Sequence, residues 1–382
     1  MALQPVIRDF QEETERGVRI PAPLVERLRA VGLYRMAVPR LLGGLQLDLL
    51  VLLQIVELAA EADGSVGWNL INNSTNQLAA LGLPDEGVAE VFGARPDPII
   101  GGTVVPGGGR AREVPGGYLV TGRWRFGSGC QEAQWCVSNF SVWDGEEPRR
   151  HADGTPRLWR SFFRRDEVTV HETWHMTGMR GTGSHDWSVE DVFVPVRRTL
   201  PVPPTPFTNQ WQRWEGTLYQ LPVQAVLGPH HSVVATGIAR AAIDALCALA
   251  STKVPRGRTT LLRDEFQVQE AVARAEAVLG AGQAFRDQVT AELWDTVAAG
   301  RSTTIEQRAR CRLASVYAVD CARQAMDLMF RAGGTTSNQQ GQRLEQCWRD
   351  VNVVSQAATN MPEWYPVTGR VLLGLPADPR LG

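Results

Sequence analysis

The sequence predicts an α+β protein of three parts: a helical N-terminal domain over residues 1–95, a central β-sandwich or barrel over residues 96–205, and a C-terminal four-helix bundle over residues 206–382. Three changes of pattern along the chain predict this order. Apolar residues have helical spacing up to about residue 93, and short β-rich runs between glycine, proline and charged turns follow to about residue 202. Helical spacing then returns and continues to Pro362.

The N-terminal part contains two clear helical segments. Leu24, Leu28 and Val31 have helical spacing, and Gly32 ends that segment. Residues 45–62 are strongly apolar and place one stripe of side chains on a single face, namely Leu49, Leu52, Leu53, Val56, Ala59 and Ala60. We therefore expect a buried helix that ends where Asp63-Gly64-Ser65 interrupts the pattern.

The central part contains two segments rich in small residues. Residues 116–129 predict a short strand, a turn and a second strand that ends in small residues. Residues 174–186 include four positions where the backbone can pass close to a flat or anionic ligand, namely Gly178, Gly181, Gly183 and Ser184. An alternating strand over 187–194 follows and ends at Pro195. Residues 201–206, rich in proline, predict a stiff connector to the bundle.

The C-terminal part predicts four main helices. Two of them cover about 231–250 and 264–299. A third begins at a capping box formed by Thr303 and Glu306 and ends at Gly333. The last covers about 343–360. Four helices of this length predict a bundle whose core lies between their apolar faces.

Composition excludes several classes of function. The formal net charge of −2 gives no field that would favour nucleic acid or an anionic membrane surface. Six cysteines without CxxC spacing predict neither disulfides nor a metal site. The first residues lack a basic segment followed by an apolar one, so we expect a cytoplasmic protein that does not span a membrane.

The motifs, in their order and spacing, resemble those of the acyl-CoA dehydrogenase superfamily and in particular its two-component flavin-dependent monooxygenases. The resemblance covers nearly the whole chain, and its motifs are the two central segments, Gly43-Gly44, Asp63-Gly64-Ser65-Val66-Gly67-Trp68, Gly333-Gly334 and Leu344-Glu345-Gln346-Cys347-Trp348-Arg349-Asp350. It implies an acyl-CoA dehydrogenase-like fold in a homotetramer built as a dimer of dimers. It also implies reduced flavin (FAD or FMN) supplied by a separate flavin reductase, and O2 as the co-substrate that forms a C4a-hydroperoxide.

The same resemblance assigns flavin contacts to residues of this chain. Ser128 matches a hydroxyl position beside flavin N5, although a strand-end serine can also bond to its own backbone. Phe126 and Trp124 either pack on the isoalloxazine ring or fill the sheet interior. Thr182 and Ser184 match positions that bind the flavin phosphate or ribityl chain. The other candidate flavin-binding residues, several of which complete a neighbouring subunit's site in relatives, are Gly129, Arg180, Arg258, Gln269, Gly333, Gly334 and Ser337.

Missing residues restrict the chemistry. Dehydrogenases of this family need a carboxylate as base, and the expected place after Gly334 holds Gln340 and Gly341. Phenol-hydroxylating relatives carry histidines after the Arg-Asp pair, where this chain has Asn352 and Gln356 as substrate-pocket candidates. His230 and His231 remain as candidate catalytic residues. The alternative for both is a helix-start pair that faces solvent or stacks on Trp211 or Trp214.

The sequence therefore predicts a flavin-dependent monooxygenase that hydroxylates an electron-rich aromatic substrate, such as an indole or a polycyclic compound of secondary metabolism (antibiotic biosynthesis, for example). An amine or amino-sugar N-hydroxylase is the alternative, and a carboxylate near the pocket, such as Glu215, would favour it. A third hypothesis is an acyl-CoA dehydrogenase-like protein that has lost catalysis and only binds a ligand.

Overall fold

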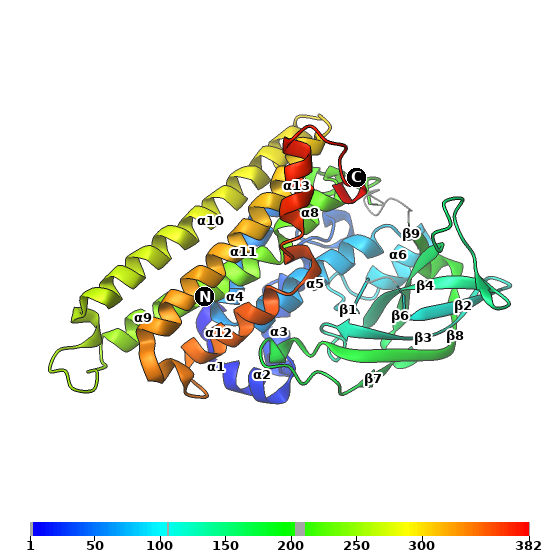
Figure 1. The fold of residues 1–382 in the computed structure, drawn as a ribbon. Helices are drawn as coiled ribbons and strands as arrows, with labels where there is room; N and C mark the ends of the chain where they lie inside the picture. The colour runs from blue at the N-terminus through cyan, green and yellow to red at the C-terminus, as the bar shows by residue number, and fades with distance from the viewer. Residues whose placement is uncertain (1–2, 105–106, 203–210, 382) are drawn as a thin grey trace.

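The structure is a computed structural model that describes residues 3–104, 107–202 and 211–381. Six helices form the N-terminal part, namely α1 (Leu3–Asp9), α2 (Gln11–Gly17), α3 (Ala22–Ala30), α4 (Leu49–Ala62), α5 (Gly64–Ala80) and α6 (Asp85–Phe92). A sheet lies on one side of the molecule and the long helices of the bundle lie on the other, with α5 between them (Figure 1). The fold is therefore mixed α/β with a helical C-terminal region.

Helices α4 and α5 meet at a well-defined cap. The predicted apolar stripe of α4 is buried over its whole length. Asp63 has extended backbone, and its carboxylate accepts hydrogen bonds from the backbone N–H groups of Ser65 and Val66. This carboxylate satisfies two of the N–H groups that every helix start leaves without a partner. The predicted break after residue 62 is confirmed as the start of a second helix.

The strands form one continuous sheet in the order β7-β8-β3-β2-β4-β6-β9, with β1 and β5 also paired to β4. Their bounds are β1 (Ile100–Gly102), β2 (Gly109–Val114), β3 (Gly117–Gly127), β4 (Trp135–Asp144), β5 (Glu147–Pro148), β6 (Leu158–Arg164), β7 (Thr169–His171), β8 (His185–Pro195) and β9 (Thr199–Val202). The turn predicted inside residues 116–129 was wrong, because β3 passes through it unbroken. Gly122 marks an irregularity in the pairing with β8, and a Cβ there would lie 2.6 Å from the Gly108 carbonyl oxygen. The glycine thus serves close packing within a strand.

An aromatic core fixes the position of β3. The Trp124 ring lies 4.5 Å from the Trp187 ring and 5.7 Å from the Phe163 ring, so β3, β8 and β6 share one interior. Its indole N–H donates to the Asn139 carbonyl, and only 2% of the residue is exposed. Trp124 therefore fills the sheet interior, the second of the two alternatives, and has no surface for a flavin contact.

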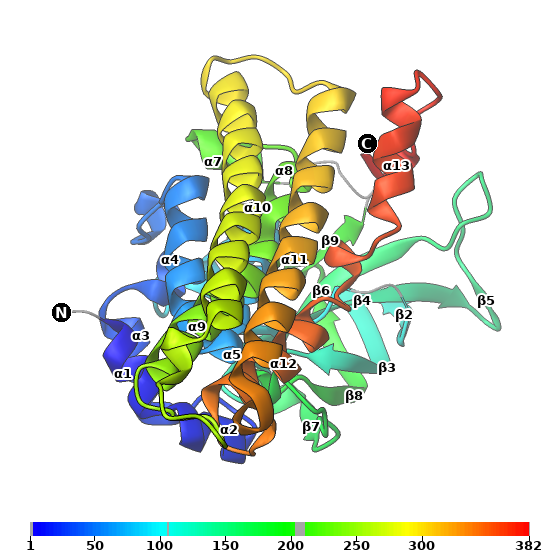
Figure 2. The ribbon, with the colours of Figure 1, turned by 60° about the vertical axis from the view of Figure 1, so that its left-hand side comes forward.

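Seven helices follow: α7 (Thr217–Gln220), α8 (Val223–His230), α9 (Ser232–Ala250), α10 (Phe266–Ala298), α11 (Ile305–Gly333), α12 (Arg343–Val354) and α13 (Trp364–Leu372). α10 and α11 are the longest and lie side by side (Figure 2). The capping box of α11 lies one residue later than predicted, because Thr304 and Gln307 exchange the two bonds. The last predicted helix ends early, at Val354, and a 3₁₀ turn over Ala358–Asn360 replaces its final turn. Residues 203–206 of the predicted connector lie outside the described residues.

One segment, Ala225–Ala250, is long and apolar enough to cross a membrane. Two thirds of its most apolar window (67%) is buried inside the protein. It contributes core residues to the packing between α4, α11 and α12. Its hydropathy is therefore accounted for by its central position in the bundle.

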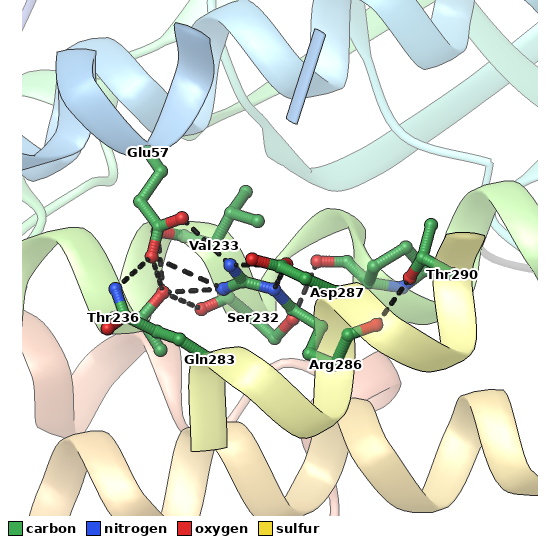
Figure 3. Close-up of polar contacts among 9 residues, drawn as sticks. Glu57, Ser232, Val233, Thr236, Gln283, Arg286, Asp287 and Thr290 are labelled. Carbon is green, nitrogen blue, oxygen red and sulfur yellow. Dashed lines mark hydrogen bonds and ion pairs between the residues drawn. The ribbon is translucent and has the colours of Figure 1, made fainter. Parts of the chain in front are cut away.

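A buried ion pair joins the N-terminal helices to the bundle. Arg286 on α10, only 1% exposed, donates to both carboxylate oxygens of Glu57 on α4, and Thr236 on α9 lies between them (Figure 3). Gln283 donates to the same carboxylate at 2.8 Å. Burial alone would lower the pKa of Arg286, but the charges of Glu57 and Asp287 outweigh it and raise that pKa. The cluster therefore fixes three helices in one register.

Candidate active site

Ser128 lies at the end of β3, where the chain leaves the sheet. Phe126 and Gly129 on either side of it have left-handed backbone (φ 62° and 69°), and the Phe126 side chain is 49% exposed. Left-handed backbone at a phenylalanine costs conformational energy, and such strain is found most often at binding sites. The strained turn lies at the end of an interior strand, where Ser128 is half-buried and the Phe126 ring is exposed.

A chain of hydrogen bonds runs inward from Ser128. The indole N–H of Trp68, on α5, donates to Ser128 Oγ at 3.0 Å. Ser128 Oγ lies 2.7 Å from Ser184 Oγ, which in turn lies 2.7 Å from Thr182 Oγ1. Thr182 Oγ1 donates to the Met179 carbonyl at 2.9 Å. The two segments singled out in the sequence therefore meet through their hydroxyl groups.

Burial distinguishes the three hydroxyl residues. Ser128 is half-buried, whereas Thr182 and Ser184 are 1% and 4% exposed. This placement departs from the expectation that Thr182 and Ser184 bind a flavin phosphate or ribityl chain directly. Thr182 ends a tight 3₁₀ turn over residues 180–182, and its hydroxyl and that of Ser184 are enclosed by the surrounding protein. In this chain they support Ser128.

The two predicted histidines stack with Trp68 of the same cluster. The His231 ring stacks on Trp68 at 4.0 Å and is nearly parallel to it, and the His230 ring lies 3.9 Å behind. His231 Nδ1 lies 2.6 Å from Thr359 Oγ1. The pair therefore stacks on Trp68, and the expected alternatives, a solvent-facing pair or a stack on Trp211 or Trp214, were wrong.

Burial determines the protonation state of both histidines. Burial, reinforced by the charge of Arg312, lowers the pKa of His230 to about 3. Burial and the neighbouring His230 lower the pKa of His231 well below its usual value. Both rings are therefore neutral at physiological pH, and neither is exposed enough to touch a substrate from its present position. His231 packs on the Trp68 indole, and His230 packs on His231.

A buried carboxylate holds the loop that carries Thr182. Met179 has left-handed backbone (φ 53°), and its N–H donates to Asp350 on α12. Burial, together with the nearby charges of Asp63 and Glu15, raises the pKa of Asp350 to about 7. Arg180, the next residue of the loop, donates to the Glu15 carbonyl and is only partly exposed. Asp350 thus fixes the loop backbone and does not face the Ser128 surface.

The remaining predicted flavin residues lie elsewhere in the chain. They gather at the end of the bundle that is remote from the sheet, around the start of α10 and the end of α11 (Figure 1). Arg258 is exposed and pairs with Glu265 at 3.4 Å, and Gln269 bonds to the Arg263 carbonyl. Lys253, the only lysine of the chain, bonds to the Gly333 carbonyl at 2.8 Å and braces the turn that also contains Gly334 and the buried Ser337. One chain therefore does not bring the two groups together.

The substrate-pocket candidates lie on α12 and just beyond it. Asn352 is half-buried and donates to the Trp348 carbonyl of its own helix, and Gln356 is exposed. Both precede Thr359, which bonds to His231, so this segment lies against the histidine pair. Trp348 itself is 39% exposed and adds aromatic surface to the helix.

Of the carboxylates near Ser128, Glu132 lines a small enclosed cavity with Ser128 and Gly129 and pairs with Arg19 at 3.0 Å, and burial raises its pKa to about 7. The other two are used by the backbone. Among the described residues, Asp63 caps α5 and Asp350 bonds to Met179. Glu215 lines a separate surface hollow of about 530 Å³ with Arg40, Arg213 and Asp85. The larger hollow of about 630 Å³ lies between α10 and α11, and Ser128 is not among the residues that line it. Glu215, the carboxylate named as favouring amine oxidation, therefore does not lie beside Ser128.

Sequence reasoning missed Trp68, Asp350 and Thr359 as site residues. Trp68 and Asp350 belong to motifs that carried the family resemblance, but nothing in their own spacing indicates a contact with Ser128 or Met179. Such contacts join residues 60 and 171 positions apart. Only the folded arrangement brings them together.

Comparisons with known proteins identify the family and agree with the fold. The model of the "Acyl-CoA dehydrogenase, C-terminal domain" family matches residues 230–361. Indole-3-acetate monooxygenase of Pseudomonas putida is 30% identical over 362 residues, which are 95% of this chain and 89% of that protein. The oxygenase subunit HsaA of a flavin-dependent monooxygenase from Rhodococcus jostii is 30% identical over 381 residues, 98% of this chain and 97% of that one. The crystal structure of a 3-HSA hydroxylase from Rhodococcus superposes with a TM-score of 0.89 at 28% identity, covering 100% of this chain and 97% of that chain.

The fold and the site define an oxidoreductase with the acyl-CoA dehydrogenase-like fold. The chain belongs to the flavin-dependent monooxygenases of that fold, as the oxygenase component of a two-component system.

Proposed function

We propose that the enzyme hydroxylates an electron-rich aromatic compound, with an indole or a larger fused ring as the preferred substrate. The observation that carries the proposal is that none of the described titratable groups around Ser128 is both exposed and unpaired. Asp63 and Asp350 are bonded to the backbone, the enclosed Glu132 is paired with Arg19 at 3.0 Å, and both histidines are buried and neutral. A ring that is nucleophilic without losing a proton fits such a surface. The Pseudomonas putida relative, named for indole-3-acetate, supports this choice.

Reduced flavin, as FAD or FMN, fits the surface around Ser128. The exposed Phe126 ring offers a flat apolar contact, and the buried Asn69 carboxamide oxygen beside Gly129 has no hydrogen-bond partner among the described residues. Unsatisfied buried acceptors are rare and indicate a missing donor. When bound, reduced flavin supplies the electrons that activate O2. The residues of this chain hold the ring, orient Ser128 through Trp68, and limit the access of water.

We also propose a homotetramer and a diffusing flavin reductase as partners. The support for the tetramer is the separation of the candidate flavin residues into two groups at opposite ends of one chain. A second copy would bring Gln269 and the Gly333–Ser337 turn of one subunit to the Ser128 surface of another. Sedimentation equilibrium tests this directly, and a monomer at micromolar concentration would contradict it.

A coupled assay under ¹⁸O₂ tests the proposed function. The enzyme is mixed with a flavin reductase, NADH and either FMN or FAD, and with one of three substrates: indole-3-acetate, resorcinol or an alkylamine. We expect one ¹⁸O atom in the indole product by mass spectrometry, and no NADH consumption when the reductase is left out. Labelling of the amine alone would favour N-hydroxylation. No labelling of any substrate, with flavin bound, would favour a binding protein.

A further inference from the structure

Arg160, on β6, is a half-buried arginine without an acidic partner. Its Nε–H donates to Asn139 Oδ1 at 3.3 Å, and no other hydrogen bond or ion pair joins its guanidinium to a residue that the structure describes. The residues outside the described ranges include no Asp or Glu. Burial lowers the pKa of Arg160 to about 10, so the side chain keeps its positive charge at neutral pH. This charge therefore has no side-chain carboxylate beside it.

Two arginines that are more deeply buried each have a carboxylate partner. Arg29 approaches Asp97 to 3.0 Å, and Arg198 approaches Glu90 to 2.6 Å. An unpaired charge inside a protein is costly, because it has lost water and gained no opposite charge in return. The exception at Arg160 therefore indicates a ligand that brings a negative charge.

The guanidinium of Arg160 is arranged to bind a carboxylate. Its Nε–H is held by Asn139, which is 1% exposed and whose own amide N–H donates to the Val104 carbonyl at 2.6 Å. The two terminal nitrogens have no acceptor among the described residues, and together they present the pair of N–H groups that binds both oxygens of a carboxylate. The neighbours of Arg160 on this face of the sheet, Phe162 and Leu200, are buried and uncharged. One isolated positive charge matches a carboxylate better than a phosphate, which carries nearly two negative charges.

The sheet places Arg160 close to Ser128, because β1, β4 and β6 are neighbouring strands (Figure 1). Gly102 on β1 pairs with Ser128 on one side and with Val137 of β4 on the other. Asn139 is two residues beyond Val137 and lies on the same face of β4. Adjacent strands are about 4.8 Å apart and each residue advances about 3.3 Å, so the Arg160 guanidinium, bonded to Asn139, lies on the order of 10 Å from Ser128. A fused aromatic ring with a short acid side chain can reach from one to the other.

We infer that Arg160 binds a carboxylate carried by the aromatic substrate, so that the enzyme prefers aromatic acids to their neutral analogues. The inference rests on the proposed function, which places an electron-rich ring at the Ser128 surface. It adds the charged group of the substrate and the residue that recognises this group. Arg160 is thus a specificity residue, which binds a part of the substrate away from the reacting ring, and Asn139 positions its guanidinium.

The coupled assay with flavin reductase and NADH tests this inference by comparing indole-3-acetate with indole-3-acetamide, which has the same ring and nearly the same shape but no charge. We expect wild type to have the higher kcat/KM for the acid. Arg160→Met should lower kcat/KM for the acid about tenfold to a hundredfold, mostly through KM, and should change kcat/KM for the amide less than about twofold, because only the acid loses a charge-assisted hydrogen bond. Arg160→Lys should give an intermediate value for the acid, since lysine keeps the charge but not the paired N–H groups.

Arg157→Met is the matched control. Arg157 is exposed and lies over the Trp159 ring at 5.4 Å, and the Trp159 side chain is on the opposite face of β6 from Arg160. This control removes an equal charge three residues away. Since exposed charges are screened by salt, the acid-to-amide ratio of kcat/KM should stay within about twofold of the wild-type ratio.

The outcomes separate the inference from the proposed function. If wild type oxidises neither compound although flavin binds, the proposed function fails and the inference with it. If wild type oxidises both compounds and Arg160→Met leaves the acid-to-amide ratio unchanged, the inference is wrong while the proposed function stands. With an unchanged ratio, weaker binding of FMN and FAD by Arg160→Met would assign its charge to a flavin phosphate, and equal losses on both compounds would show that Arg160 only braces Asn139. Far-UV circular dichroism and the retained turnover of the amide confirm that the variant is folded.

Discussion

Removal of the Glu57 carboxylate should strongly destabilise the protein, because it leaves the Arg286 guanidinium buried without its main partner. In the ion pair, the Arg286 and Glu57 side chains are 2% and 16% exposed, and their charged atoms approach to 2.8 Å. Breaking a buried pair of this kind costs about 3–5 kcal/mol. Asp287 remains 2.8 Å from the guanidinium, although it is 44% exposed, so we expect Glu57→Met to cost about 3 kcal/mol, near the lower limit.

Urea unfolding followed by far-UV circular dichroism, at one fixed protein concentration, measures the change as a shift of the midpoint. The double variant Glu57→Met/Arg286→Met removes both charges and should return to within about 1 kcal/mol of wild type. Glu270→Met is the control on α10, the helix that carries Arg286, because it breaks the exposed pair with Arg274 and should cost less than about 1 kcal/mol. The reasoning is refuted if Glu57→Met costs no more than the control, or if the double variant is as unstable as the single one.

Three further results are expected. Ser128→Ala should raise uncoupled H2O2 several-fold to about tenfold, since a hydrogen bond worth about 0.5–1.5 kcal/mol is lost; an unchanged yield of product per NADH would place Ser128 away from the reacting ring. His230 should make the protein less stable as the pH falls from about 6.5 toward 3, because its pKa is about 3 when folded and about 6.5 when unfolded, so the unfolded state binds the proton first. The contribution of His230 to the free energy of unfolding should change by no more than about 1.4 kcal/mol per pH unit. An acid unfolding curve that is the same for wild type and His230→Gln would contradict this expectation. Asp350 acts in the opposite direction, since its pKa is about 7 when folded, so the stability it contributes is lost as the pH rises from about 4 to 7. Asp350→Asn keeps an acceptor for Met179 and should be more stable than wild type at pH 8, by an amount on the order of 2–4 kcal/mol, yet nearly equal to it at pH 4; equal stabilities at both pH values would show that the carboxylate carries no charge penalty.

Helices and strands could be predicted from the sequence where a single face is buried. The apolar segment predicted as a helix over 45–62 is α4, which begins four residues later at Leu49 and ends as predicted, and alternation over 187–194 gave β8 to within two residues at its start. Gly122 was wrongly predicted to lie in a turn, because glycine in a turn and glycine in a crowded strand have the same sequence signal. The error at the start of α11 has a similar cause, since Thr303 and Thr304 are adjacent and either could cap.

The site was partly predictable for a different reason. Ser128, Thr182 and Ser184 were singled out by the family resemblance, and the structure brings them into one chain of hydrogen bonds. The sequence gives no information on which hydroxyl stays exposed, because that depends on how the 180–182 turn packs against α5. The protonation states of His230 and Asp350 could not be predicted either, because a pKa depends on burial and on charges that come from distant parts of the chain.

Two residues in the first two turns of helix α9 belong to two different structural clusters. His231, at its start, supports the indole that orients Ser128, and Thr236 belongs to the buried ion cluster. The two residues are five positions apart, or about 7.5 Å along a helix. A substitution that loosens the ion cluster would let the start of α9 shift. This shift would move the His231 ring that stacks on Trp68. Attempts to engineer a more heat-resistant form of the enzyme should therefore leave these two turns unchanged, because a substitution there would affect both stability and turnover.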